Sequence, residues 1–270
     1  MSDIFGYKGK RVAIAGCFSG VGEAAARRLV EMGAEVHGVD VRPSPVPLAS
    51  FRLMDLRDPR AIDEAVAAIG GEIDALFNCA GLPQTFPPLD VVKVNFIGMR
   101  HWIEAWLPHI KKGGAVASIA STAAYRFLSR VPFVMQIVNT PDFDSAVTWV
   151  EAHADTIGDS YTFAKEALIL YTQKRAAEVI KQGVRMNVTL PSPIKTPMMD
   201  EFVKVAPASA FEIFSQPMGR LSTPSEQADP LLLLNSEAAR FINGHALMVD
   251  GGFVGAVNTG VIDMSKPGAR

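Results

Sequence analysis

A tyrosine and a lysine stand four residues apart, at Tyr161 and Lys165, where an apolar pattern typical of a helix begins. Side chains at that spacing lie on one face of a helix, one turn apart. A tyrosine ordinarily titrates near pKa ~10 and a lysine near ~10.4, so neither alone is a useful acid or base at neutral pH. A nearby ammonium favours the phenolate and lowers the tyrosine pKa. The pair therefore predicts a group that exchanges a proton near neutral pH.

A serine hydroxyl is expected beside this pair. Ser121 ends the apolar strand AVASIAS, and the ends of parallel strands face the ligand site of such a sheet. There its hydroxyl would hydrogen-bond and orient a substrate oxygen. With a hydride carrier bound alongside, these side chains would interconvert an alcohol and a carbonyl. Taken singly, the tyrosine and lysine are an ordinary solvated helix face and the serine an ordinary turn residue, so the combination carries the prediction.

The first predicted strand, RVAIAG, leads into the glycine-rich stretch GCFSGVG, with glycines at 16, 20 and 22. Glycine lets the backbone turn tightly and approach a ligand closely. The helix that follows offers free N–H groups and a positive dipole end to a pyrophosphate. The stretch therefore predicts a dinucleotide cradle; a tight turn whose glycines serve packing alone is the alternative.

The second predicted strand, EVHGVDV, carries Asp40 near its end. A carboxylate there can accept hydrogen bonds from a ribose 2′-hydroxyl and would repel a 2′-phosphate, which favours NAD over NADP. Arg42, two residues later, opposes this prediction because a guanidinium can attract that phosphate. A solvated charge at a strand end is the alternative for Asp40. Asp55, at the end of the third strand, is expected either to approach the adenine or to cap its own loop.

The elements that would position these residues alternate along the chain. Helices are expected at 20–32, at 58–69 with Asp58 as its cap, at 88–110, and from 160 to 179. The expected strands are RVAIAG, EVHGVDV, FRLMDL, DALFNCAG, AVASIAS, VRMNVTLP and HALMVDGG. Near-continuous apolar strands between helices predict a parallel sheet covered on both faces. We expect a single α/β domain over residues 1–270, built as a Rossmann-type doubly wound sheet in three αβα layers.

Composition limits the partners of the chain. Of its 270 residues 49% are hydrophobic, and 26 basic against 28 acidic side chains leave a formal charge of −2. That balance argues against a nucleic-acid or membrane partner. The polar N-terminus does not resemble a signal peptide, and no apolar run reaches membrane-spanning length. Cys17, Cys79 and the five histidines show no metal-ligand spacing, so we expect free thiols, no metal and a reducing, cytoplasmic compartment.

In combination, these motifs are similar to those of the short-chain dehydrogenase/reductase family, over about residues 9–252. GCFSGVG resembles the family's cofactor loop, NCAG its motif after the fourth strand, and PSPIKTPM its segment beside the nicotinamide. The resemblance implies a seven-stranded sheet. It also puts Asn95 of VNFIG in the place of a helix-kinking asparagine that helps hold a relay water beside Lys165. The implied catalytic residues are Asn95, Ser121, Tyr161 and Lys165. The implied cofactor-binding residues are Gly16, Ser19, Gly20, Val21, Gly22, Asp40, Asp55, Leu56, Asn78, Ala80, Gly81, Tyr161, Lys165, Pro191, Ile194 and Thr196.

Three departures from the family pattern bear on the structure. Ser192 stands where the family usually has glycine, which leaves the local turn open. Pro230 is expected to interrupt the helix opened by TPSE, a plausible capping box. Ser121 and Tyr161 are 40 residues apart (161 − 121), more than in the commonest members. A helical insertion at about 126–159 is therefore expected at the active-site mouth, as in the family's hydroxysteroid and coniferyl alcohol dehydrogenases.

The insertion and the segment 198–218 are both rich in large apolar side chains. We expect them to line a pocket for a bulky ring substrate, with methionine giving an adaptable wall. Packing against each other or against another subunit is an equal alternative. Arg126 and Arg130 are the candidates for binding a substrate carboxylate or phosphate. The apolar residues of the second segment are Met198, Met199, Phe202, Val205, Phe211, Ile213, Phe214 and Met218.

The sequence thus predicts an NAD-dependent oxidoreductase that interconverts a hydrophobic secondary or aryl alcohol, hydroxysteroid-like or phenylpropanoid-like, and its carbonyl. Tyr161 would take the hydroxyl proton, and a relay through Lys165 and Asn95 would pass it to water. The family resemblance implies a homodimer or homotetramer. One alternative is a cofactor-binding sensor of the same fold without turnover, against which the intact catalytic set argues. Another is a sugar-nucleotide epimerase or dehydratase, whose usual glycine spacing differs.

Overall fold

The structure, a computed structural model, describes residues 4–204 and 212–264. Seven parallel strands form one sheet in the order β3-β2-β1-β4-β5-β6-β7. The strands are β1 (Arg11–Ala15), β2 (Glu35–Asp40), β3 (Ser50–Leu53), β4 (Ile73–Asn78), β5 (Ile110–Ile119), β6 (Arg185–Pro191) and β7 (Ala246–Val249). The strand order reverses between β1 and β4, and ligands of such sheets bind in the crevice at that reversal, beyond the carboxyl ends of the strands.

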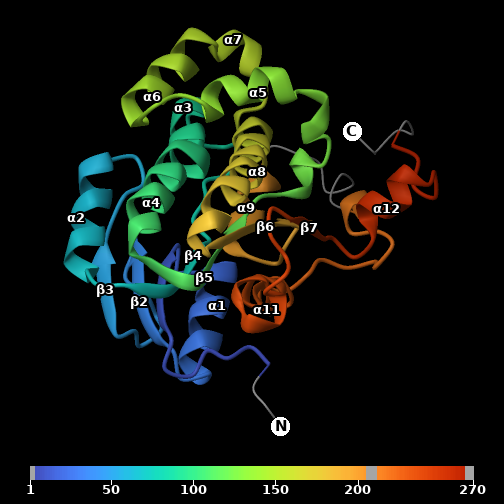
Figure 1. Cartoon of the computed structure of the whole chain (residues 1–270). Helices are drawn as coiled ribbons and strands as arrows, with labels where there is room; N and C mark the ends of the chain where they lie inside the picture. Colours follow the sequence, from blue (N-terminus) through green and yellow to red (C-terminus); the bar gives the residue numbers. More distant parts are fainter. Residues whose placement is uncertain (1–3, 205–211, 265–270) are drawn as a thin grey trace.

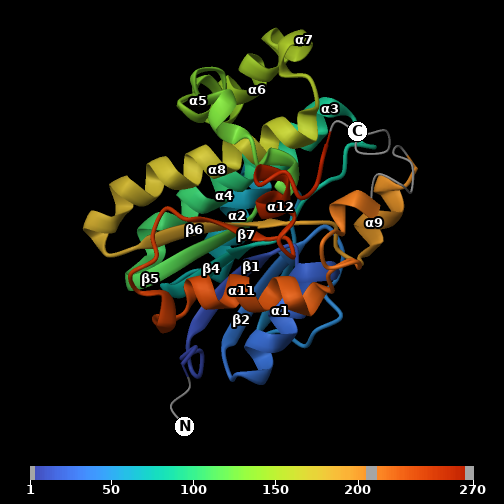
Figure 2. The ribbon, with the colours of Figure 1, turned by 90° about the vertical axis from the view of Figure 1, so that its right-hand side faces the viewer.

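Helices cover both faces of the sheet, which confirms the predicted three-layer α/β fold. The helices α1 (Gly20–Glu31) and α11 (Pro224–Asn235) lie on one face, and α2 (Pro59–Ile69), α4 (Gly98–Trp106) and α8 (Ser160–Val179) lie on the other (Figures 1 and 2). The predicted cap of α2 is present, because the Asp58 carboxylate accepts the N–H of Arg60. Each face carries its own buried apolar cluster.

The helix predicted over 88–110 is continuous but changes its winding in the middle. It runs as α3 (Pro88–Val92), a π-helical turn (Lys93–Ile97), α4, and a 3₁₀ turn (Leu107–His109). Such π turns inside α-helices occur frequently at functional sites. Asn95 lies in the middle of this turn and is fully buried, so the expected irregularity at Asn95 is confirmed.

The helix α11 corrects one prediction. Its capping box forms as expected between Thr223 and Glu226, but the helix continues through Pro230 to Asn235. A proline inside a helix removes one backbone hydrogen bond and costs about 3 kcal/mol. Leu231 and Leu232 are fully buried in the cluster beneath the sheet. Burying an aliphatic side chain stabilises by roughly 1.5–3 kcal/mol, so these two offset the cost of the proline.

The insertion forms three short helices at the outer ends of α3 and α8 (Figure 1): α5 (Val131–Val138), α6 (Phe143–Ala152) and α7 (Ala154–Ile157). Apart from the exposed Leu128, its large apolar side chains pack against the core, and Val134 and Ile137 are fully buried in the same cluster as the helices beneath them. The buried guanidinium of Arg100, on α4, donates to the carbonyls of Ile137, Thr140 and Asp142. A core residue thus holds the end of α5 in place.

Two further helices complete the site side of the molecule: α9 (Pro197–Phe202), directly after β6, and α12 (Phe253–Asn258), after β7. Among the helices of the described residues, none has both the length and the apolar character that crossing a membrane requires.

Candidate active site

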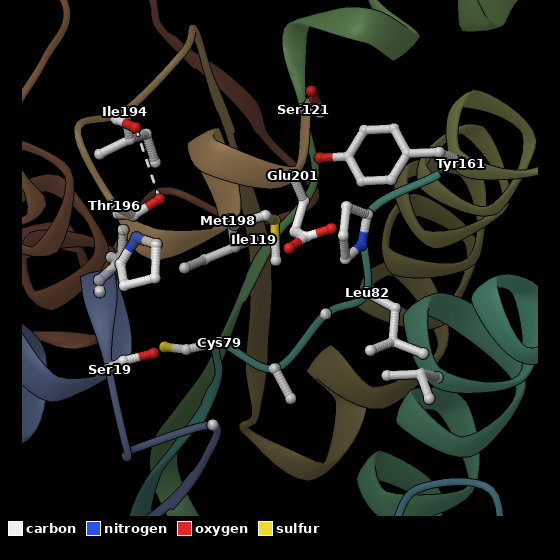
Figure 3. A pocket seen from close by; sticks show the side chains of 18 of the residues that line it. Ser19, Cys79, Leu82, Ile119, Ser121, Tyr161, Ile194, Thr196, Met198 and Glu201 are labelled. Atoms are coloured by element: carbon white, nitrogen blue, oxygen red, sulfur yellow. Dashed lines mark hydrogen bonds between the residues drawn. The ribbon is translucent and has the colours of Figure 1, made fainter. Parts of the chain in front are cut away.

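A cavity of about 910 Å³ opens at the carboxyl ends of the central strands and collects most of the predicted site residues. Its lining includes the loop after β2, the catalytic candidates and the helix α9. Figure 3 shows Ser19, Ser121, Tyr161 and Glu201 among the side chains that line it. Gly22, Asn78 and Asn95 are absent from its described lining. The predicted residues that line it are Gly16, Ser19, Gly20, Val21, Asp40, Asp55, Leu56, Ala80, Gly81, Ser121, Tyr161, Lys165, Pro191, Ile194 and Thr196.

The glycine-rich loop fits a dinucleotide because its backbone comes very close to the loop after β4. Gly16 has φ +86°, and a Cβ there would lie 2.3 Å from the backbone nitrogen of Ala80. A Cβ at Gly22 would lie 1.8 Å from the Gly16 carbonyl oxygen. Gly22 thus packs α1 against the loop, whereas Gly16 shapes the cavity wall itself. The Ser19 side chain caps no N–H of α1, so the helix start remains available to an anion.

The carboxylate of Asp40 is fixed at the end of β2. One oxygen accepts the N–H of Phe18 at 2.9 Å and the other the N–H of Arg42 at 3.2 Å. The guanidinium of Arg42 lies 4.0 Å from the centre of the Phe18 ring. The loop thus holds a negative charge in the cavity and turns the nearby positive charge onto an aromatic face.

Asp55 caps its own loop, which was one of its two expected roles, and it also lines the cavity. It accepts the N–H of Arg57 at 2.9 Å and pairs with that guanidinium at 2.6 Å. The hydrogen bond from the Arg57 guanidinium lowers the pKa of the Asp55 carboxyl. Arg57 also pairs with Asp90 at 3.0 Å, so its charge is shared between two carboxylates.

Tyr161 and Lys165 lie one turn apart on α8, and both are buried at the floor of the cavity. The Lys165 ammonium donates to the carbonyl of Ile119 at 2.8 Å and lies 5.7 Å from the centre of the Tyr161 ring. The Ser121 side chain faces the Tyr161 hydroxyl (Figure 3). The Ser121 hydroxyl also accepts the N–H of Ala123 at 3.1 Å, which fixes its position. The predicted catalytic trio is therefore assembled.

The electrostatics of the trio correct one prediction. Burial raises the pKa of Tyr161 to about 12, and the neighbouring Ser121 hydroxyl acts in the opposite direction. Burial lowers the pKa of Lys165 to about 8. The expected lowering of the tyrosine pKa by Lys165 is absent from this described site, because desolvation penalises the charged form of both side chains. A phenolate here needs positive charge in addition to the lysine.

Asn95 and Asn78 are buried behind the cavity wall and are not part of its described lining. Asn95 donates to the carbonyl of Leu82 at 2.8 Å and accepts its N–H at 2.7 Å, so it holds the loop after β4. A Cβ on Gly81 would lie 3.2 Å from the Asn95 oxygen and 3.7 Å from the Lys165 nitrogen, which places both groups on the same side of the glycine. Asn78 donates to Ser118 at 2.9 Å and joins β4 to β5.

On the substrate side, the two expected alternatives, packing and pocket lining, apply to different segments. The insertion contributes no residue to the described lining of the cavity, and its large apolar side chains other than Leu128 pack in or against the core. Arg126 lies over the Tyr125 ring and Arg130 lies 3.6 Å from Glu166, so neither reaches the cavity. Four of the expected residues from the segment after β6 do line it: Met198, Met199, Phe202 and Phe214. Ile213 and Met218 do not, and Val205 and Phe211 lie outside the described residues.

Sequence reasoning missed Glu201, whose carboxylate points into the cavity (Figure 3). The helical spacing of Glu201 from Met198 could have revealed it in the sequence. Residues three and four apart share one face of a helix, so a helix that turns Met198 into the cavity also turns Glu201 and Phe202 there.

The turn at Ser192, which the sequence left open, is defined in the structure. The Ser192 N–H donates to the carbonyl of Val249 at 3.3 Å, and Ser192 lines the cavity.

The fold and the site together are those of the short-chain dehydrogenases. A family model described as short chain dehydrogenase matches residues 10–132, and one described as enoyl-(acyl carrier protein) reductase matches residues 145–254. The chain belongs to the short-chain dehydrogenase/reductase family, and it is an oxidoreductase of that family.

Individual relatives are similar over nearly the whole chain. Coniferyl-alcohol dehydrogenase of Pseudomonas sp. (strain HR199 / DSM 7063) is 32% identical over 90% of this chain and 96% of its own. The 3-alpha-hydroxysteroid dehydrogenase/carbonyl reductase of Comamonas testosteroni is 31% identical over 89% and 95%. The solved 3-alpha-hydroxysteroid dehydrogenase from Pseudomonas sp. B-0831, complexed with NADH, superposes with a TM-score of 0.78 at 28% identity and covers 94% of this chain and 100% of its own.

Proposed function

We propose that this protein is an NAD-dependent oxidoreductase that interconverts a hydrophobic secondary or aryl alcohol, hydroxysteroid-like or phenylpropanoid-like, with its carbonyl. The observation that carries the proposal is the meeting of Ser121 with the buried Tyr161 and Lys165 in one cavity with the glycine-rich loop. The apolar wall from the segment after β6 supports a hydrophobic substrate. The names of the two relatives, a coniferyl-alcohol and a hydroxysteroid dehydrogenase, support the substrate class.

A nicotinamide dinucleotide, when bound, supplies or accepts the hydride. Gly16, Gly20 and the free N–H groups at the start of α1 would hold its pyrophosphate. Asp40 would accept hydrogen bonds from the ribose hydroxyls, and its charge disfavours a 2′-phosphate. Arg42 also lines the cavity, but its guanidinium lies on the Phe18 ring and is not paired with the Asp40 carboxylate. These observations support NAD over NADP.

The chain's own residues would handle the proton. Ser121 would hydrogen-bond the substrate oxygen and orient it toward Tyr161. Tyr161 would give a proton to a carbonyl oxygen or take one from a hydroxyl. Because burial opposes the phenolate, an ammonium on Lys165 and any further positive charge in the cavity would favour it. Asn95 would keep the loop beside Lys165 in place and serve the relay to water.

The first experiment is turnover measured by nicotinamide absorbance, with NAD and NADP supplied separately, on hydroxysteroids, cinnamyl-type alcohols and simple aryl alcohols, plus the matching carbonyls in reverse. Tyr161→Phe is expected to lower kcat at least about 10³-fold, within the range for loss of a general acid–base. Cofactor binding, measured by fluorescence titration, should be unchanged. Tyr125→Phe, which removes a hydroxyl outside the cavity lining, is the matched control and should retain full activity.

Two results would contradict the proposal. Substantial turnover by Tyr161→Phe would refute the role of the tyrosine. Tight cofactor binding with no turnover on any alcohol or carbonyl of the panel would favour the sensor alternative, in which the fold binds a nucleotide without catalysis.

A further inference from the structure

One acidic side chain interrupts the apolar substrate side of the cavity. Glu201, on α9, accepts a hydrogen bond from the Thr85 hydroxyl at 3.3 Å. Thr85 belongs to the loop after β4, so this contact joins the two walls across the cavity. Lys204 pairs with the other carboxylate oxygen from outside the described lining. The apolar residues around Glu201 on this side of the cavity are Leu82, Pro83, Phe86, Met198, Met199 and Phe202.

The carboxylate is ionised and retains acceptor capacity. The hydrogen bond with Lys204, followed by that with Thr85, lowers the pKa of Glu201. An ionised carboxylate has about four lone-pair sites, and the described contacts use two of them. Figure 3 shows the carboxylate of Glu201 inside the cavity, and the next residue, Phe202, packs against the Tyr161 ring with ring centres 5.3 Å apart. A ligand that reaches Ser121 and Tyr161 therefore passes close to a negative acceptor.

No cation of the described lining pairs with Glu201, whose ion-pair partner Lys204 lies outside that lining. The cations there are Arg42, Arg57 and Lys165. Arg57 is paired with two aspartates at the nucleotide end, and Arg42 lies on the Phe18 ring. Lys165 donates to a backbone carbonyl on the floor. Lys204 offsets part of the Glu201 charge from outside the lining. A substrate carboxylate would still meet a Glu201 oxygen with no cation of the described lining paired to it, whereas a hydroxyl would meet an acceptor.

We propose that Glu201 determines specificity by binding a second hydrogen-bond donor of the substrate, a hydroxyl or phenol remote from the reacting carbon, and by rejecting substrates with a carboxylate at that place. The substrate class is then a hydroxylated hydrophobic alcohol rather than a plain or an acidic one. This inference rests on the proposed alcohol oxidation, which it narrows.

The test compares substrates that differ by one remote group. Cinnamyl alcohol is paired with 4-hydroxycinnamyl alcohol, and a monohydroxysteroid with its diol that carries the second hydroxyl at the far end. A hydrogen bond to a charged group is worth roughly a 10- to 100-fold change. We expect kcat/KM to favour the hydroxylated member of at least one pair about 10-fold. Glu201→Ala should abolish that preference, and Glu201→Gln, which keeps an acceptor oxygen, should retain part of it.

Asp200→Asn is the matched control. It removes a carboxylate from the same helix, but Asp200 is exposed and is not in the described lining, so the preference should persist. A second comparison uses benzyl alcohol and 4-carboxybenzyl alcohol. The wild type should disfavour the carboxylated member, and Glu201→Gln should reduce that discrimination about 10-fold or more.

The outcomes separate this inference from the proposed function. Equal kcat/KM for both members of every pair in the wild type, or a preference that survives Glu201→Ala, would overturn the role of Glu201 and leave alcohol oxidation standing. Absence of turnover on every alcohol would overturn the proposed function and, with it, the inference.

Discussion

Two segments with similar apolar composition border the active-site region, and they bury their side chains in different places. The insertion at 126–159 directs Val134 and Ile137 into the core beside α8. The segment that begins with α9 directs Met198, Phe202 and Phe214 toward the cavity. The insertion is also tied down by the buried guanidinium of Arg100, whereas α9 is only six residues long and meets the opposite wall through Glu201.

This difference separates stability from specificity. A buried apolar side chain contributes through the water it leaves and the atoms it touches, so the insertion should determine how firmly α8 is held. A side chain on a cavity wall makes part of its contacts with the ligand instead, so α9 should determine which substrate binds. Variants in each segment can test whether the two roles are as separate as the contacts indicate.

The largest effect is expected in the insertion. Ile137→Ala removes a fully buried side chain and should lower the free energy of unfolding by about 2–5 kcal/mol, the usual cost of such a cavity. KM and kcat of the folded enzyme should change less than about twofold. Leu128→Ala is the control in the same insertion, because Leu128 is 71% exposed and its loss should cost less than about 0.5 kcal/mol. Denaturant unfolding and steady-state kinetics measure both. A large change in KM with Ile137→Ala would show that the insertion also shapes the substrate site.

The opposite pattern is expected for α9. The Phe202 ring packs edge-on against Tyr161, with ring centres 5.3 Å apart. Phe202→Ala should raise KM for hydrophobic alcohols roughly 10-fold, because an aromatic contact beside the reacting group is lost. The melting temperature should change little, since Phe202 is only partly buried. Val203→Ala, at an exposed neighbour outside the described lining, should leave KM unchanged. An unchanged KM with Phe202→Ala would mean that the substrate does not touch α9.

The fold and the nucleotide half of the site were predictable because their signals are local. Buried parallel strands are continuously apolar, and a glycine between Ala15 and Cys17 is dictated by the backbone of Ala80 only 2.3 Å from where a Cβ would be. Asp40 follows from its place at the end of β2. Each of these residues acts through its own strand or turn, so its type and position in the sequence are enough to find it.

The substrate half was less predictable because composition does not say what an apolar side chain packs against. Ile137 and Met198 are equally apolar, and only the tertiary contacts put one in the core and the other on the cavity wall. The pKa of Tyr161 was mispredicted for the same reason. The helical spacing to Lys165 was visible in the sequence, but the burial that outweighs it depends on the whole fold.

The smallest expected effect is at the contact between the insertion and the catalytic helix. Glu166 follows Lys165 in the sequence and is buried. Its carboxylate lies 3.6 Å from the guanidinium of Arg130, which belongs to the insertion. One carboxylate oxygen of Glu166 has no hydrogen-bond partner among the described residues. Burial raises the pKa of Glu166, and Arg130 opposes this rise. Between the ordinary glutamate pKa and this raised value, the folded state binds more protons than the unfolded state. The stability contributed by Glu166 is therefore full at acidic pH and is lost as the pH rises through that window.

Glu166→Gln should remove this loss, because a glutamine carries no charge to bury and can still accept from Arg130. The variant should gain on the order of 1 kcal/mol over the wild type at neutral pH and little or nothing near pH ~4, with kcat unchanged. Glu178→Gln, on the exposed end of the same helix, should show the opposite sign, because hydrogen bonds from Arg175 and Lys174 lower the pKa of Glu178. Urea unfolding at several pH values measures how the free energy of unfolding of each variant, relative to the wild type, changes with pH. A Glu166→Gln variant that is less stable than the wild type at neutral pH would show that the ion pair with Arg130 outweighs the cost of burial, and that the insertion is held to α8 by charge as well as by apolar packing.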